Sequence, residues 1–207
     1  MKKKKLFLES CCTSLEEVKK ACLCGADRIE LCEDISSGGV TPSLDLLEKT
    51  LSSSTIPVNA MIRPRGGNFV YSEDEIQQMI KDINSFKDLD VNGFVFGCLT
   101  PDNEVDIPAM KKLMAAASRK PVTFHRAFDS VRDPQKALED IISLGCTHIL
   151  TSGNTENAFD GRFNIAKLVE QAAGRITIIA GKGIRKGNLE QIAEDSKAPQ
   201  LHGTNLF

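Results

Sequence analysis

The chain has 207 residues and a formal net charge of -2, with 41% hydrophobic and 26% charged residues. This balance is typical of a globular protein and gives no electrostatic reason to expect binding to nucleic acid or to an anionic membrane. The one charge cluster, residues 2–5, is predicted to be a solvated N-terminal extension. Because no long apolar segment follows it, we expect no signal peptide, no membrane-spanning helix and a cytoplasmic location.

The sequence contains seven cysteines, an odd number, and no secretory signal is recognised. A framework of disulfide bonds is therefore not expected. The paired Cys-x-x-Cys spacing of many structural zinc sites is also absent. Most of these cysteines are predicted to be small buried hydrophobic residues, whereas Cys11, Cys12 and Cys32 stand at the ends of the first two predicted strands.

The first half of the chain alternates short apolar runs with segments of helical spacing. A serine, Ser72, followed three residues later by Glu75 is typical of a capping box at the start of a long helix. Strands are predicted at residues 6–11, 29–32, 57–63 and 93–99, and helices at 14–24, 42–51, 72–89 and 107–117.

The second half continues the same alternation. A Pro-initiated helix is expected where Pro134 follows Asp133. Strands are predicted at residues 122–126, 148–151, 176–180 and 200–203, and helices at 133–144, at 165–172 and through residues 189–192.

Eight predicted strands and seven helices leave two main architectures, an open doubly wound sheet and a closed (β/α)8 barrel. The strands are nearly continuous apolar runs, as in parallel sheets covered by helices on the outside. A Gly-x-Gly-x-x-Gly fingerprint is absent after the first strand, where Cys11-Cys12-Thr13 stands, which weakens the dinucleotide-binding option. We therefore predict a small TIM barrel that forms one domain over residues 1–207 and lacks its final helix.

A barrel without its last helix leaves part of its apolar wall bare. We expect a partner subunit or the chain ends to cover this wall, and hence a homo-oligomer.

Polar residues repeatedly end the predicted strands or follow them directly. In a TIM barrel these positions meet at one face, where the loops after the strands build the active site. The segment 121–129 is the richest, because it delivers an imidazole and two charges within five residues. The candidate catalytic residues are Glu9, Glu30, Arg63, His125, Arg126, Asp129 and His202.

Several further residues at the same face indicate anion binding. Arg63 and Arg65 flank Pro64, and two guanidinium groups there suit a carboxylate or phosphate. The alternative is that Arg63 forms salt bridges with the strand-end glutamates inside the barrel. Lys182-Gly183 follows the seventh strand, where barrels often hold phosphate, and Ser152 is expected to add hydrogen-bond donors. His125 is either a general acid or base, or a neutral histidine hydrogen-bonded to a carboxylate.

The alternation of side chains along a strand links the two remaining cysteines. If Glu9 points into the barrel, so does Cys11, and the same holds for Glu30 and Cys32. Because the first two strands are neighbours, the two thiols are expected to face each other at the barrel mouth, with Cys12 pointing outward. Two thiolates at one rim form a plausible Cu(I) site. The alternative is two small rim cysteines without a ligand.

Several longer motifs resemble those of the copper homeostasis protein CutC family. They include Gly-Ala-Asp-Arg-Ile-Glu-Leu-Cys, Met-Ile-Arg-Pro-Arg-Gly-Gly and Val-Thr-Phe-His-Arg-Ala-Phe-Asp, and the match runs from about residue 8 to residue 202. The resemblance implies a cytoplasmic, often oligomeric TIM barrel associated with copper handling, without an established reaction. It also implies Cu(I) binding by cysteines at the mouth, here Cys11 and Cys32. Longer family members continue past the last predicted strand.

Three functions remain open. The first is cytoplasmic Cu(I) binding or trafficking, with the copper ion as partner. The second is an enzyme that acts on a small phosphorylated or carboxylated metabolite, because copper binding alone does not need so many charged residues at one mouth. The third is a non-catalytic scaffold protein, which no motif in the sequence specifically indicates.

Overall fold

The computed structural model describes residues 6–204 and 206–207, and the N-terminal extension predicted at residues 2–5 lies outside this range. Eight parallel strands form a closed barrel in which each strand pairs with the next one in sequence and the last pairs with the first. The predicted TIM barrel is therefore confirmed. The strands are β1 (Phe7–Cys12), β2 (Arg28–Leu31), β3 (Val58–Met61), β4 (Gly93–Phe96), β5 (Val122–Phe124), β6 (His148–Thr151), β7 (Thr177–Gly181) and β8 (Gln200–Gly203).

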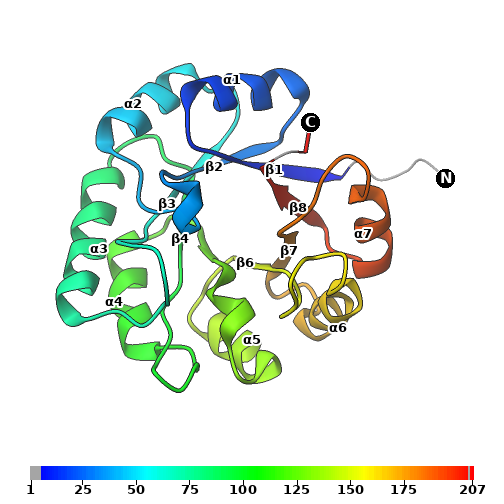
Figure 1. Ribbon diagram of the computed structural model, residues 1–207. Coiled ribbons are helices and arrows are strands. Elements are labelled where there is room, and N and C mark those ends of the chain that lie inside the picture. The colour runs from blue at the N-terminus through cyan, green and yellow to red at the C-terminus, as the bar shows by residue number, and fades with distance from the viewer. Residues whose placement is uncertain (1–5, 205) are drawn as a thin grey trace.

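Seven α-helices surround the barrel among the described residues (Figure 1). The side chain of Ser72 caps the third helix, and Glu75 completes the capping box that the sequence predicts. The helices are α1 (Leu15–Cys24), α2 (Leu44–Ser53), α3 (Glu73–Phe86), α4 (Ile107–Ala117), α5 (Pro134–Ser143), α6 (Arg162–Ala172) and α7 (Leu189–Ser196), with 3-10 turns η1 (Ile35–Ser37) and η2 (Arg126–Ser130).

Two predicted boundaries are wrong for identifiable reasons. The fifth strand does not reach residue 126, because His125 accepts a hydrogen bond from the Ala127 backbone N–H through Nδ1 and so caps η2. Helix α2 does not begin at Pro42, because the Ser43 side chain accepts from the Leu46 N–H and sets the start of the helix two residues later, at Leu44.

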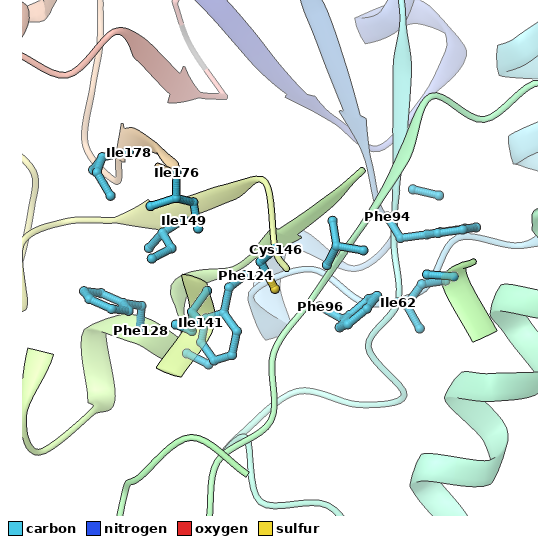
Figure 2. Packing of buried hydrophobic residues seen from close by; sticks show 14 of the residues in the cluster. Ile62, Phe94, Phe96, Phe124, Phe128, Ile141, Cys146, Ile149, Ile176 and Ile178 are labelled. Atoms are coloured by element: carbon cyan, nitrogen blue, oxygen red, sulfur yellow. The ribbon is translucent and has the colours of Figure 1, made fainter. Parts of the chain in front are cut away.

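The main hydrophobic core lies between the outer face of the barrel and the helices. Outward-facing residues of the strands, among them Phe94, Phe96 and Phe124, pack there with helix residues such as Ile141 (Figure 2). These side chains are completely buried, so the outer wall supplies most of the apolar burial that stabilises the fold. Cys12, Cys98 and Cys146 belong to this core, as predicted for small hydrophobic residues, whereas Cys24 is exposed.

The inner face of the barrel has a different composition. Positions that alternate with the outer core carry buried polar side chains, including Glu9, Arg28, Glu30, Asn59 and Thr123. Burying so many polar groups is costly unless they are hydrogen-bonded to one another. The need for a stable fold therefore does not by itself explain why the interior of the barrel carries so many polar side chains.

No helix follows β8 among the described residues. Instead, Leu206 is buried and Phe207 packs against the main core, so the wall expected to be bare is covered in part by these residues. The C-terminal end of the chain lies close to β1 and α1 in Figure 1. Among the described residues, we find no helix with the length and apolar character needed to cross a membrane.

Candidate functional site

A cavity of about 800 Å³ lies at the end of the barrel where the strands terminate. This volume is within the usual range for small-molecule sites. The residues expected at the mouth divide into two groups. Glu9, Arg65 and Ser152 do not line the cavity. Those that do are Cys11, Glu30, Cys32, Arg63, His125, Arg126, Asp129, Lys182, Gly183 and His202.

Glu9 forms the buried floor of this region. It lies opposite Arg28 on β2 and His202 on β8, and its carboxylate bonds both of them. Its Oε1 accepts from His202 Nδ1 at 2.8 Å, and its Oε2 forms an ion pair with Arg28 Nε. Burial would raise the pKa of Glu9, but His202 and Arg28 outweigh burial and lower this pKa to about 2. Glu9 is therefore a permanent anion in the barrel.

Glu30 and His202 stand next to each other above this floor. His202 Nε2 lies 3.7 Å from Glu30 Oε1, and Glu30 Oε2 is buried without a hydrogen-bond partner among the described residues. Burial raises the pKa of Glu30, and the nearby Glu9 raises it further. Burial would lower the pKa of His202, but the two glutamates outweigh burial and raise it. Glu30 and His202 therefore both hold a proton more readily than they would in water, beside the Glu9 anion.

Cys11 and Cys32 face each other as the strand alternation predicts. Their sulfur atoms are 3.6 Å apart, and both residues are buried. With Met61 and Val95 they form a small cluster separate from the main core, to which Cys12 belongs. The hydrogen bond to Cys32, together with burial, raises the pKa of the Cys11 thiol well above its usual range. Without a cation, this thiol is protonated at neutral pH.

Arg63 is held by the backbone rather than by carboxylates. Its Nη1 donates to the carbonyls of Ser37 and Gly39 at 3.0 and 2.9 Å, and its Nη2 donates to Gly67 O at 2.9 Å. The salt bridges to Glu9 or Glu30 expected as an alternative are not formed among the described ion pairs. Its Nε is buried without a partner among the described residues.

The glycine loop after β2 allows this close approach. Gly39 has a φ of 84°, and a Cβ placed on it would lie 3.2 Å from Cys32 Sγ. A side chain at Gly38 would likewise come within 3.0 Å of Arg63 Nη1. Glycine at both positions thus lets the backbone pack against the thiol and the guanidinium.

His125 occupies the other side of the cavity. Its Nδ1 accepts from the Ala127 N–H, so the neutral ring carries its proton on Nε2, which has no partner among the described residues. The Phe69 ring lies 4.9 Å from the imidazole, centroid to centroid. Burial and the Arg63 charge lower the pKa of His125 to about 3. His125 is thus a neutral donor, and it does not bond a carboxylate.

Asp129 connects the turn η2 to the end of β6. Its Oδ1 accepts from Thr151 Oγ1 at 2.6 Å and from the Ser152 N–H at 2.8 Å, and its Oδ2 lies 3.1 Å from Arg126 Nε. The Ser152 hydroxyl donates to the carbonyl of Thr155. These contacts give Asp129 and Ser152 a role in holding the mouth together.

Arg65 points away from the cavity. It forms an ion pair with Glu75 at the start of α3, with Nε and Oε1 2.5 Å apart, and lies over the Tyr71 ring. The structure therefore separates Arg65 from Arg63, although one residue divides them in sequence.

Three of the site residues that were not predicted contact the predicted ones. Arg28 balances Glu9, Met61 adjoins the thiols, and Phe69 contacts both Arg63 and His125. The alternation rule contained the signal for two of them. Arg28 is two residues before Glu30, and Met61 is two residues before Arg63.

Comparison with known proteins matches residues 6–206 of the chain to the model of the CutC family. The chain belongs to the CutC family. A CutC protein of Glaesserella parasuis is 47% identical over 195 residues, covering 94% of this chain and 80% of that protein. The human copper homeostasis protein cutC homolog is 47% identical over 196 residues, covering 95% of this chain and 72% of the human protein.

Solved structures show the same relationship. The crystal structure of a putative copper homeostasis protein CutC from Streptococcus agalactiae has a TM-score of 0.93 at 34% identity, covering 98% of this chain and all of that one. An aldolase named QR15 has a TM-score of 0.74 at 13% identity, covering 99% and 92% of the two chains, and shares the fold alone. Membership of the CutC family thus carries the association with copper homeostasis.

Proposed function

We propose that this CutC protein handles copper in the cytoplasm by binding Cu(I) through the thiolates of Cys11 and Cys32, and that it acts as a homo-oligomer. The single observation that carries the copper site is the pair of sulfur atoms 3.6 Å apart on the wall of the cavity. Thiolate and thioether ligands select Cu(I), and Met61 adds a thioether to the same small cluster.

The site would be filled from the cavity, because both cysteines line it. Binding would release the Cys11 thiol proton, because the cation stabilises the thiolate that the hydrogen bond to Cys32 and burial otherwise disfavour.

A competition titration tests this function. Reduced protein competes with a chromogenic chelator for Cu(I), and we expect one ion per chain in the wild type and a loss of at least about tenfold in affinity in Cys11→Ser or Cys32→Ser. Cys12→Ser is the matched control, because Cys12 is an equally buried neighbour in the outer core. Equal affinity in all four proteins would contradict the proposed copper site.

The second candidate is an enzyme that acts on a small anionic metabolite. His202 and Arg28 lower the pKa of Glu9, whereas burial raises the pKa of Glu30, and such opposite shifts are typical of sites that move protons. Arg126 and Lys182 at the cavity wall supply positive charge for a phosphate or carboxylate.

Thermal-shift screening of phosphorylated and carboxylated metabolites tests this candidate. A binding metabolite should raise the melting temperature of the wild type and of the control Lys49→Ala, but not of Lys182→Ala. Binding that does not depend on Lys182, or no binding across the whole panel, would count against it.

A further inference from the structure

The two thiols are not the only metal-binding groups at this point of the cavity. One ligand atom from each of Cys11, Glu30 and His202 lies within 4.8 Å of the others, and all three residues are buried. Cys32 adds a fourth donor, because its sulfur is 3.6 Å from that of Cys11. All four residues line the same cavity, so their donors converge at its wall.

His202 is oriented as metal-binding histidines usually are. Its Nδ1 is held by the Glu9 carboxylate at 2.8 Å, which leaves Nε2 facing Glu30 Oε1 at 3.7 Å. This second distance is too long for a hydrogen bond. A carboxylate that fixes one ring nitrogen while the other faces the ion is the common support of a metal-bound histidine. Arg28 in turn holds Glu9 in place.

Glu30 supplies an independent observation. Its Oε2 is buried and has no hydrogen-bond partner among the described residues, although the side chain is only 3% exposed. A buried carboxylate oxygen without a hydrogen-bond partner is rare in a protein interior, and a bound ion is one explanation for it. A cation bound between this carboxylate and the thiols would give the Glu30 oxygen a partner.

The spacing of the sulfur atoms indicates the geometry of the ion. Two thiolates bound tetrahedrally at about 2.3 Å lie roughly 3.8 Å apart, whereas an ion on the line between them would separate them by about 4.6 Å. The observed separation is 3.6 Å. The pair therefore suits an ion displaced to one side of the sulfur–sulfur line, with room for further ligands.

We propose that Cys11, Cys32, Glu30 and His202 together form a four-residue site for a divalent transition-metal ion of the zinc type. The mixed sulfur, nitrogen and oxygen donors match the ligands of Zn²⁺, whereas sulfur alone would be expected for a site dedicated to Cu(I). The inference rests on the proposed function only in that both use the same thiol pair. Glu9 is a positioning residue of this site.

Cobalt(II) is the probe that tests the site, because its absorption reports both geometry and sulfur ligation. Reduced, metal-free protein should bind one Co²⁺ per chain with a thiolate-to-metal band, and Zn²⁺ should displace it. We expect His202→Ala and Glu30→Gln to weaken Co²⁺ and Zn²⁺ binding by on the order of 10- to 100-fold or more. Glu9→Gln should weaken it within the same range.

Cu(I) affinity measured on the same variants separates this inference from the proposed function. Both thiols remain in His202→Ala and Glu30→Gln, so their Cu(I) binding should stay near that of the wild type. Asp45→Asn is the control, because Asp45 is an exposed carboxylate of α2 that does not line the cavity. Circular dichroism checks that each variant is folded. If His202→Ala does not fold, the isosteric Glu30→Gln variant alone decides the test.

Two outcomes would overturn the four-residue site. One is a wild type that binds Co²⁺ without a thiolate band, or does not bind it. The other is a folded Glu30→Gln variant with the Co²⁺ affinity of the wild type. Co²⁺ binding that depends on Glu30 without any Cu(I) binding would instead support the site and contradict the copper function.

Discussion

The two sides of the cavity treat a buried histidine in opposite ways. On the acidic side, formed by Glu9, Glu30 and the two thiols, His202 is 7% exposed and the glutamates raise its pKa. On the basic side, formed by Arg63, Phe69 and Arg126, His125 is 3% exposed and its pKa falls to about 3. Similar burial is therefore accompanied by opposite pKa shifts, because the neighbouring charges differ.

This difference divides the chemistry of the site. The acidic side presents thiols, a carboxylate oxygen and an imidazole nitrogen, which are groups that attract cations. The basic side presents a neutral imidazole N–H and positive charges, which attract oxygen atoms and anions. A cation on one side and the oxygens of a ligand on the other can thus share one cavity.

The largest expected effect comes from breaking the acidic side at its base. Glu9→Gln removes the carboxylate that pairs with both Arg28 and His202 and leaves the guanidinium buried without a counter-charge. We expect the free energy of unfolding at pH 7 to fall by about 3–5 kcal/mol. Urea denaturation measures this loss, with Asp45→Asn in the exposed pair with Lys49 as control. A loss of less than about 1 kcal/mol would mean that the network does not stabilise the barrel.

The second effect sharpens the contrast between the histidines. The pKa of His125 is about 3 in the folded chain, whereas its ordinary value, expected in the unfolded chain, is 6.5. As pH falls, His125 is therefore protonated in the unfolded chain before it is protonated in the folded chain. Stability contributed by His125 is therefore present above pH 6.5 and is lost as pH falls toward 3, by up to about 1.4 kcal/mol per pH unit. His125→Asn can retain the cap on Ala127 without titrating.

Urea denaturation between pH 7 and pH 4 checks this expectation, because the difference between wild type and His125→Asn removes the contribution of other groups. The wild type should lose more stability on acidification than the variant. Parallel pH profiles would show that His125 is not held neutral.

The smallest effect concerns the rim of the basic side. Arg126→Ala removes an ion pair with Asp129, but the arginine side chain is 38% exposed and Asp129 keeps its bonds to Thr151 and Ser152. We expect a loss of no more than about 1 kcal/mol that shrinks further in high salt. Thermal melts at low and high ionic strength measure it. A larger loss that is insensitive to salt would mean that Arg126 has a structural role.

The fold was predictable because its signals are local and repeated. Strands of three to six residues separated by helices fix the order of the elements, and alternation along β1 and β2 places Cys11 and Cys32 on the inner face. The barrel closes because eight such units follow one another.

The predictions that failed or were missed concern contacts that the spacing of residues in the sequence does not determine. Arg65 lies in a loop, where no period sets the direction of a side chain, and it turns outward to Glu75. The backbone carbonyls that hold Arg63 belong to two loops, and only folding brings them together. Predicting that Glu9 pairs with Arg28 requires knowledge of the register of β1 against β2. Pairing across strands is thus the information that the local pattern lacks.

The pairing of β1 with β8 also sets when the candidate site can exist. Glu9 and His202 are 193 positions apart, so the acidic side draws on the first and the last strand. At a ribosomal rate of about 5–20 residues per second, roughly 10–40 seconds separate the synthesis of these two residues. During that interval Glu9, Arg28 and the thiols cannot be enclosed by their final neighbours. Formation of the complete site therefore reports that the ring of strands has closed.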